Sequence, residues 1–215
     1  MSKSTILLLA LASTVFAAQA QDAAAGEKKA AMCLGCHGIT GYQASFPEIY
    51  KVPMISGQST KYIVASLAAY KKGERKHPSM RGIAGSLSEA DMADLAAYFE
   101  KHGMSSVKPV ADSPAVAPTA EVAALLTKGA CASCHGANFS KPIDGAYPKI
   151  AGQHADYLYA ALRSYKVTGN PQVGRGNAIM AGQMAQFKRD DLKAIAKYLG
   201  SLPSELRTVP ESRFR

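Results

Sequence analysis

The four cysteines of this chain fall into two identical patterns, Cys-x-x-Cys-His, which end at His37 and at His135. This run is typical of an attachment site for c-type haem, because the two thiols add to the haem vinyl groups and the histidine that follows ligates the iron. The sequence therefore predicts two covalently bound haem c groups with His37 and His135 as axial ligands. The predicted thioether residues are Cys33, Cys36, Cys131 and Cys134.

Zinc knuckles, redox-active thiols and structural disulfides also use paired cysteines. The two pairs of a zinc ribbon are normally separated by about 15–20 residues, whereas Cys36 and Cys131 are far enough apart to lie in different domains. A thioredoxin-like site needs a βαβ setting, and neither that site nor a disulfide requires a histidine after both pairs. Haem attachment is therefore favoured over these three alternatives.

The sixth ligand of each iron is predicted to be a methionine. A thioether favours ferrous iron relative to a second imidazole, which suits an electron carrier of positive potential. Met80 and Met180 occupy equivalent positions in the two halves, each 18 residues before a tyrosine. Two alternatives remain open: Met184, which aligns with an alanine in the first half, and His77, which has no matching histidine in the second.

The other methionines and histidines are assigned structural roles. Met92 lies on the apolar stripe of a predicted helix, and Met32 and Met54 are close to the attachment region, so all three are predicted to pack in the interior. His102 and His154 are assigned to the surface.

Three blocks of sequence recur in the same order in both halves. The first is the haem motif followed by glycine. The second is Pro-x-Ile-x-Gly-Gln-x-x-x-Tyr at residues 53–62 and 148–157, and the third runs from Met-x-Gly to Tyr at residues 80–98 and 180–198. The offsets between the copies are 98, 95 and 100 residues, so only small loop insertions separate them. The chain is a tandem duplication.

Helical periodicity is clearest after the third block. Apolar residues follow Ser88 at i, i+3, i+4 and i+7, with Asp91 completing a capping box and Gly103 predicted to end the helix. The same pattern in the second half is predicted to end at Gly200. Further helices are predicted over residues 24–32, 59–72, 121–130 and 155–166. Because no segment alternates with the period of a strand, the fold class is predicted to be all-α.

The first twenty residues have the features of a signal peptide. Lys3 precedes an apolar stretch at residues 6–16, which is followed by an Ala-x-Ala cleavage site. This stretch is shorter than the roughly 20 residues that span a bilayer, although an uncleaved anchor is the alternative. We therefore predict export to the periplasm and a mature chain that begins at Gln21.

A proline-rich segment divides the rest of the chain. Three prolines among small residues at 109–118 predict an extended connector. The predicted division is a signal peptide at 1–20, an N-terminal domain at 21–104, a linker at 105–118 and a C-terminal domain at 119–215. Each domain is small and lacks tryptophan, so a central haem is expected to complete its core.

The net charge of +9 is unevenly shared between the halves. Residues 21–102 carry ten Lys and Arg against eight Asp and Glu, whereas residues 103–215 carry fourteen against eight. Such asymmetry can orient a protein during its encounter with an acidic partner surface, and the alternative is that these side chains only keep the second domain soluble. The expected partners are redox proteins, and no nucleic acid is expected.

With these blocks, the chain resembles the cytochrome c4 family of periplasmic di-haem class I cytochromes c. The duplicated Pro-x-Ile-x-Gly-Gln block and the distal methionine before a tyrosine-bearing helix carry the resemblance. It implies two tandem class I cytochrome c domains, packed face to face and each wrapped around one haem. It also implies that the carbonyls of Pro53 and Pro148 accept the proximal histidine Nδ1 hydrogen. Pro47 is a rival in the first half, and a simple turn role is the alternative for both prolines.

The sequence departs from the family pattern in its long connector and in three extra residues between Cys36 and Pro53. These departures leave the docking of the domains open.

Three functions are consistent with two haem sites. The favoured one is a periplasmic carrier of single electrons between respiratory-chain partners, toward a terminal oxidase, with no substrate chemistry of its own. Its donor and acceptor would be membrane-bound respiratory complexes or periplasmic redox proteins, and a peripheral position at the membrane surface is compatible with it. The alternative is the haem-bearing subunit of a sulfide- or thiosulfate-oxidising complex. A di-haem peroxidase is disfavoured, because two matched methionines would leave neither iron open to peroxide.

Overall fold

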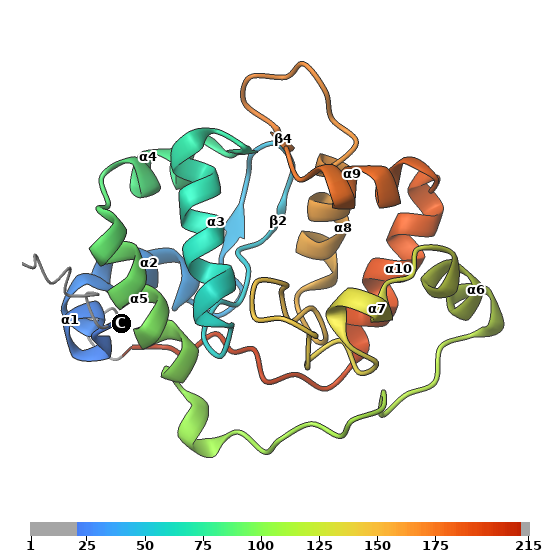
Figure 1. Cartoon of the computed structure of the whole chain (residues 1–215), viewed down its shortest axis with the longest axis horizontal. Helices are drawn as coiled ribbons and strands as arrows, with labels where there is room; N and C mark the ends of the chain where they lie inside the picture. The colour runs from blue at the N-terminus through green and yellow to red at the C-terminus, as the bar shows by residue number, and fades with distance from the viewer. Residues whose placement is uncertain (1–20, 212–215) are drawn as a thin grey trace, which may run out of the picture.

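Two helical domains lie side by side and are joined by an extended connector (Figure 1). The computed structural model describes residues 21–211, so the predicted signal peptide lies outside the described residues. Helices dominate both domains, which confirms the all-α prediction. The fold consists of two tandem halves with the same order of major helices.

The N-terminal domain is built on the packing of α1 and α3 against α5. Ser88 caps α5: its hydroxyl accepts a hydrogen bond from Asp91 N at 3.1 Å, and the carboxylate of Asp91 accepts one from Ser88 N at 3.0 Å. α1 crosses α5 closely at Gly26, where a Cβ atom would lie 2.1 Å from the carbonyl oxygen of Asp94. The helices are α1 Ala23–Lys29, α2 Ala31–His37, α3 Thr60–Lys72, α4 Pro78–Gly85 and α5 Glu89–Lys101.

The C-terminal domain repeats this plan, with α6 and α8 packed against α10. The prediction that α10 ends at Gly200 is wrong, because the helix runs through Ser201. A Cβ atom at Gly200 would lie 2.9 Å from both the Cβ of Ala155 and the carbonyl oxygen of Gln153. The glycine is therefore needed for close packing against the start of α8. The helices are α6 Ala120–Lys128, α7 Ala132–His135, α8 Ala155–Ser164, α9 Ala178–Ala185 and α10 Arg189–Ser201.

Two short strand pairs add to the helices. β1 Gln43–Ala44 and β2 Tyr50–Lys51 form a hairpin within the N-terminal domain. β3 Arg75–Lys76 pairs antiparallel with β4 Gly174–Arg175 of the other domain, which sets Arg75 opposite Arg175. Strands of two residues are too short to show alternation in a sequence, which explains why they were not predicted.

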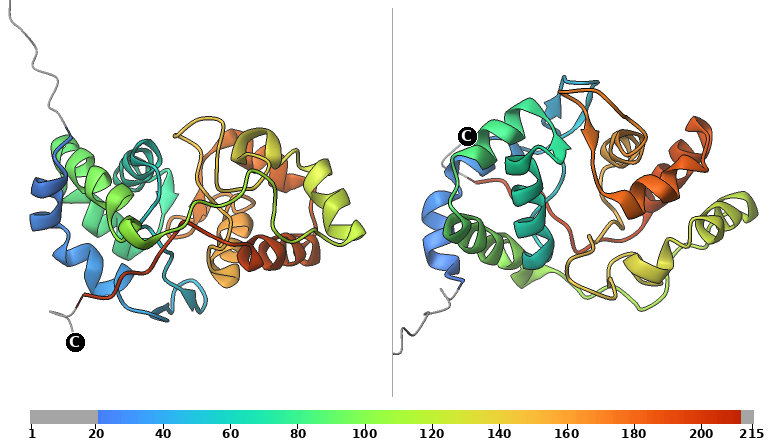
Figure 2. Two further views of the ribbon diagram at one scale, coloured as in Figure 1. Left: turned by 90° about the horizontal axis from the view of Figure 1, so that it is seen from below. Right: turned by 45° about the horizontal axis from the view of Figure 1, so that its top comes forward.

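After α10 the chain turns back and crosses to the N-terminal domain (Figure 2). Arg207 N donates to the carbonyl oxygen of Ser56 at 2.9 Å. Further along, Glu211 lies 3.1 Å from Nε2 of His102, whose Nδ1 is 2.8 Å from Ser56 Oγ. The assignment of His102 to the surface is wrong, because this C-terminal tail (residues 203–211) covers its side chain, which is only 9% exposed.

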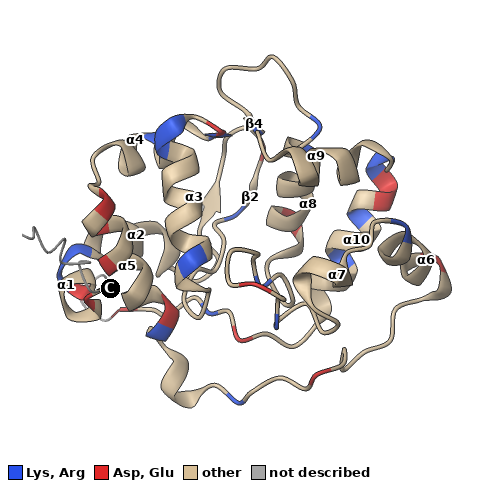
Figure 3. Cartoon of the chain, viewed as in Figure 1, with Lys and Arg blue, Asp and Glu red and all other residues tan. Residues whose placement is uncertain are grey.

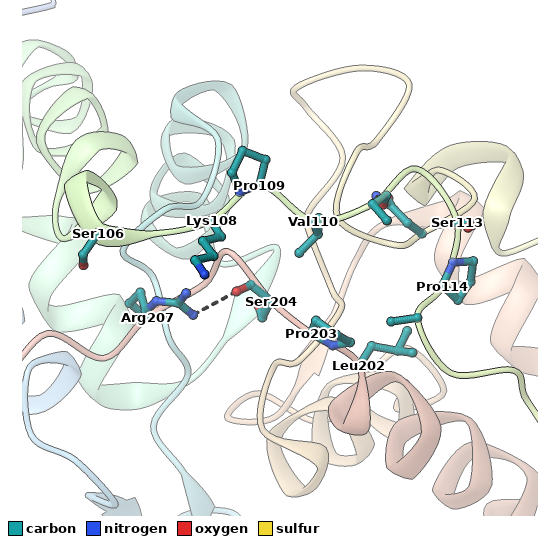
Figure 4. Close-up of a pocket in the computed structure, with 13 residues that line it drawn as sticks. Ser106, Lys108, Pro109, Val110, Ser113, Pro114, Leu202, Pro203, Ser204 and Arg207 are labelled. Carbon is teal, nitrogen blue, oxygen red and sulfur yellow. Dashed lines mark hydrogen bonds between the residues drawn. The ribbon is translucent and has the colours of Figure 1, made fainter.

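The C-terminal tail and the connector enclose a cavity of about 480 Å³ (Figure 4). In it, Arg207 donates to the carbonyl oxygen of Ser204 at 2.8 Å. None of the residues that line the cavity belongs to a Cys-x-x-Cys-His motif. The cavity therefore lies between the C-terminal tail and the connector, away from the predicted haem attachment sites. It is lined by Ser106, Lys108, Pro109, Val110, Ala111, Ser113, Pro114, Ala115, Asn138, Leu202, Pro203, Ser204 and Arg207.

Candidate haem-binding sites

The two Cys-x-x-Cys-His motifs lie on different local backbones. In the N-terminal domain the whole motif lies on α2, whereas in the C-terminal domain Cys131 is the N-cap of the short helix α7. Ala130, which precedes it, has a positive φ of 46°. Cys33 and Cys131 each pack against the hydrophobic core of their own domain. One thiol of each pair is thus anchored by packing.

The surroundings of the thiols argue against the zinc alternative. Burial raises the pKa of Cys33 to about 11 and also raises that of Cys131. Zinc ligation requires thiolates, which a raised pKa disfavours. Within residues 21–211, no three His, Cys, Asp or Glu side chains gather into a metal-binding group. The thiols therefore fit covalent attachment better than zinc ligation.

Each motif histidine donates to a proline carbonyl. His37 Nδ1 lies 2.7 Å from the oxygen of Pro53, and His135 Nδ1 lies 3.0 Å from that of Pro148. A carbonyl only accepts, so the proton is on Nδ1 and the lone pair of Nε2 is left for a metal. Burial lowers the pKa of both histidines, which keeps them neutral and able to ligate. This donor set fits haem iron, and Pro47 is not the acceptor in the first half.

Met80 and Met180 take the same place in two equivalent helices. Each is the third residue of an eight-residue helix, α4 or α9, and its backbone N–H is bound by the N-cap side chain. The cap is His77 in the first domain, at 3.4 Å, and Asn177 in the second, at 2.9 Å. His77 thus has the same capping role as an asparagine in the other half, which weakens the bis-imidazole alternative.

The rival methionines have different surroundings. Met184 and Met92 are both 2% exposed inside the hydrophobic cores. The prediction that Met32 packs in the interior is wrong, because it is 50% exposed. Met54 is partly buried, and its backbone contacts the other domain.

Sequence reasoning missed a pair of arginines at the junction of the domains. Arg75 donates to the hydroxyl of Tyr62 at 3.1 Å, and Arg175 donates to that of Tyr157 at 2.9 Å. Among the described residues, neither guanidinium forms an ion pair with a carboxylate, and both line a cavity of about 310 Å³ that also contacts Tyr70. Guanidinium groups bind carboxylates well, so the pair fits the anionic propionates of haem. The sequence repeat could have revealed this pair, because Arg75 and Arg175 are 100 residues apart, which is the offset between the two copies of the third block.

Comparison with known proteins agrees with this geometry. A family model described as cytochrome c matches residues 23–102 and 119–203. The cytochrome c4 of Azotobacter vinelandii is 34% identical over 212 residues, which cover 91% of this chain and 96% of that protein. The chain belongs to the cytochrome c4 family. As a cytochrome c4, it is a di-haem electron-transfer protein with two covalently bound haem c groups.

A solved structure and a further relative extend the comparison. The cytochrome c4 structure from Acidithiobacillus ferrooxidans has a TM-score of 0.59 and 27% identity, and it covers 80% of this chain and 99% of its own. A protein of Thiomonas intermedia named thiosulfate dehydrogenase electron acceptor is 28% identical over 212 residues, which cover 92% of this chain and 91% of that one. Among residues 21–211, no helix of this cytochrome c4 is long and apolar enough to cross a membrane.

Proposed function

We propose that this cytochrome c4 carries single electrons in the periplasm, from a respiratory-chain donor toward a terminal oxidase. The observation that carries the proposal is the equivalence of the two sites: each has a histidine with its Nδ1 proton bound to a proline carbonyl and a methionine at the third position of a capped helix. When bound, haem supplies an iron that exchanges one electron. The residues of the chain hold that iron, orient it and limit access to it.

The residues of the two sites have distinct roles in holding the haem. The four cysteines hold haem by thioether bonds, and His37 and His135 ligate iron through Nε2. Met80 and Met180 would supply the remaining iron ligands and leave no position for a substrate, so we propose that the protein has no enzymatic activity of its own. The carbonyls of Pro53 and Pro148 keep the proton at Nδ1 and fix the orientation of each imidazole ring.

The charges of α5 and α10 support an orientation for this transfer. These helices are equivalent in the duplication, yet α5 carries four acidic residues and one lysine, whereas α10 and its N-cap carry four exposed basic residues against Asp190 and Asp191 (Figure 3). A basic helix favours docking on an acidic surface. We therefore place the acceptor at α10 and the entry of the electron at the N-terminal domain. The exposed basic residues are Lys188, Arg189, Lys193 and Lys197, and the acidic residues of α5 are Glu89, Asp91, Asp94 and Glu100.

Paired charge reversals test this orientation. Lys193→Glu with Lys197→Glu should slow oxidation of the reduced protein by an acidic oxidase and flatten its dependence on ionic strength. Lys72→Glu with Lys101→Glu reverses two exposed charges on the N-terminal domain and should matter less. Lys71 and Lys76 are poorer controls, because they bind the carbonyls of Leu87 and Asn170. Equal effects from the two pairs would contradict oriented docking.

The periplasmic location has a separate test. The mature protein isolated from cells should begin at Gln21, and its mass should exceed that of residues 21–215 by two haems. An N-terminus at Met1 would overturn the predicted cleavage.

The second candidate is an electron-accepting subunit of a thiosulfate-oxidising complex. The name of the Thiomonas intermedia relative favours it, although that name describes the relative alone. Reduction of the purified protein by a thiosulfate dehydrogenase, together with co-purification of a catalytic subunit, would support this candidate over a free carrier.

A further inference from the structure

Two buried glutamines exchange hydrogen bonds between the domains. Gln58 and Gln153 occupy the same position in the two copies of the second repeated block, and each is 4% exposed. Gln153 Oε1 accepts from Met54 N at 3.0 Å, and its Nε2 donates to Met54 O at 2.8 Å. Gln58 makes the same two bonds to Lys149, each at 3.0 Å. Each glutamine thus binds both backbone groups of one residue in the opposite domain.

The residues that the glutamines bind follow the two prolines. The peptide group between Pro53 and Met54 presents its carbonyl oxygen to His37 and its N–H to Gln153. In the other domain, the peptide group after Pro148 presents its oxygen to His135 and its N–H to Gln58. One amide therefore connects each motif histidine to a glutamine of the other domain.

We propose that Gln153 and Gln58 are crosswise positioning residues, each of which sets the strength of the histidine–proline hydrogen bond in the opposite domain and so the reduction potential of the opposite haem. The inference deepens the proposed function, because it rests on His37 and His135 being iron ligands. The domain junction would then set the reduction potentials of the haems as well as hold the two domains together.

The effect follows from the polarisation of an amide. When its N–H donates a hydrogen bond, an amide becomes a stronger acceptor at its oxygen, by about 10–30% per bond. A stronger acceptor draws the Nδ1 proton away from the imidazole and raises the basicity of the ligand. A more basic ligand favours ferric iron, so each glutamine should lower the potential of the haem across the junction.

The glutamine side chains are held in one orientation. Each Oε1 also accepts from the backbone N–H of the next residue, Ser59 or His154, at 3.0 Å. Only one assignment of amide oxygen and nitrogen satisfies an N–H and a C=O on the same partner residue. The two contacts to the other domain are therefore fixed in direction as well as in distance.

A redox titration of the full-length holoprotein tests the proposal. Gln153→Met keeps the length of the side chain but removes both bonds to Met54. It should raise the potential of the N-terminal haem and leave that of the C-terminal haem unchanged, and Gln58→Met should do the reverse. We expect about a threefold change in the ferric-to-ferrous ratio at fixed potential, which is about 28 mV because tenfold is about 59 mV for one electron. Each haem is assigned by NMR through the Nδ1–H resonance of its histidine.

A matched control separates this effect from loosened docking. Ser59→Ala removes the interdomain hydrogen bond from Ser59 Oγ to the carbonyl oxygen of Gly145, at 2.7 Å, without changing any charge or either peptide group. It should leave both potentials in place. If Gln153→Met shifts the haem of its own domain or shifts both haems equally, or if Ser59→Ala reproduces its shift, the crosswise role is overturned.

A measurement on the unaltered protein covers the case in which the variants do not fold. In the reduced protein, scalar coupling across the hydrogen bond should connect the nitrogen of Met54 to the side-chain carbonyl carbon of Gln153. Its absence would overturn the proposal. Failure of the electron-carrier function would show differently, because the unaltered protein would then lack two one-electron steps.

Discussion

The loops that follow the two haem motifs have diverged while the contacts at the histidines have not. His37 and Pro53 are 16 positions apart, whereas His135 and Pro148 are 13 apart. The longer loop contains the β1–β2 hairpin and reaches the other domain, where the ring of Tyr50 lies 6.1 Å from that of Tyr157. The three extra residues thus lie in a loop that takes part in the docking of the domains.

The shorter loop also reaches the other domain, where Ser59 Oγ donates to the carbonyl oxygen of Gly145 at 2.7 Å, but it binds the connector as well. Asn138 donates to the carbonyl oxygen of Ala111 at 2.6 Å, and Lys141 pairs with Asp112 at 2.5 Å. The comparison shows that a duplicated fold can keep its ligand geometry while the contacts of the intervening loops diverge. Both loops contact the partner domain, and the shorter one also binds the connector.

The largest expected effect tests whether the two halves are equivalent at the sixth ligand. The oxidised protein should show a weak thioether-to-iron absorption band toward the red end of the spectrum. Met80→His should remove about half of it and Met180→His the other half, and each change should lower the potential of its own haem by more than about 59 mV, a tenfold shift. A band that survives either change would show that the assignment of that methionine is wrong.

A second prediction concerns the loops themselves. Tyr50 is 8% exposed and packs at the domain junction, so Tyr50→Ala should lower the free energy of unfolding by about 2–4 kcal/mol. Tyr147→Ala is the matched change in the shorter loop, where the side chain is only partly buried, and it should have a smaller effect. Guanidinium unfolding of both variants measures the difference. Equal losses would show that the longer loop adds no stability at the junction.

The C-terminal tail follows the C-terminal domain in sequence, but it should stabilise the N-terminal domain. A chain that ends at Leu206 loses the contacts of Arg207 and Glu211 with the N-terminal domain. Because a hydrogen bond contributes about 1 kcal/mol net, we expect a modest loss of stability there. Hydrogen exchange should accelerate in α5, near His102, more than in α8. The control Glu211→Gln removes only the charge, and it should reproduce a small part of the change.

The smallest expected effect is the loss of stability at acidic pH. Hydrogen bonds from Lys29 and Ser88 hold the pKa of Asp91 below its usual value, and those from Asp22 N–H and Lys29 do the same for Asp94. Because these folded-state pKa values are depressed, the stability they add is present above the ordinary pKa of about 4 and is lost as the pH falls below it. In the C-terminal domain, Lys128 binds the carbonyl oxygen of Gln186, which does not titrate.

Hydrogen exchange followed from about pH 5 to about pH 3 checks this difference. α1 should lose protection before α6 does. Lys29→Met should weaken the pH dependence of α1 within this window, because the hydrogen bonds from Ser88 and from Asp22 N–H remain, and an unchanged profile in that variant would contradict the assignment to the Lys29 pairs.

Features that depend on short spacing could be predicted from the sequence. The haem motifs, the repeat and the capping box of α5 each lie within a few residues of chain, where bond geometry restricts the options. The family of the protein and the two haem c groups followed from these features, and both are confirmed. The assignments of Met80, Met180 and the two prolines rest on the same repeat and remain predictions as to their roles.

Features that depend on contacts between distant segments could not be predicted. The β3–β4 pair, the exchange by Gln58 and Gln153, and the covering of His102 all join residues about 90–110 positions apart, and no local pattern marks such partners. Gly200 was misread for the same reason. A glycine near the end of a helix predicts a terminus, but here it is required by a neighbouring helix start.

The C-terminal tail also has a consequence for the order in which the protein is made. The N-terminal domain is synthesised first, yet Ser56 and His102 gain their last partners from residues 207–211. That domain therefore remains incomplete until these later residues are available to it. The half of the chain that is made first is completed only by a segment that is made after the second half.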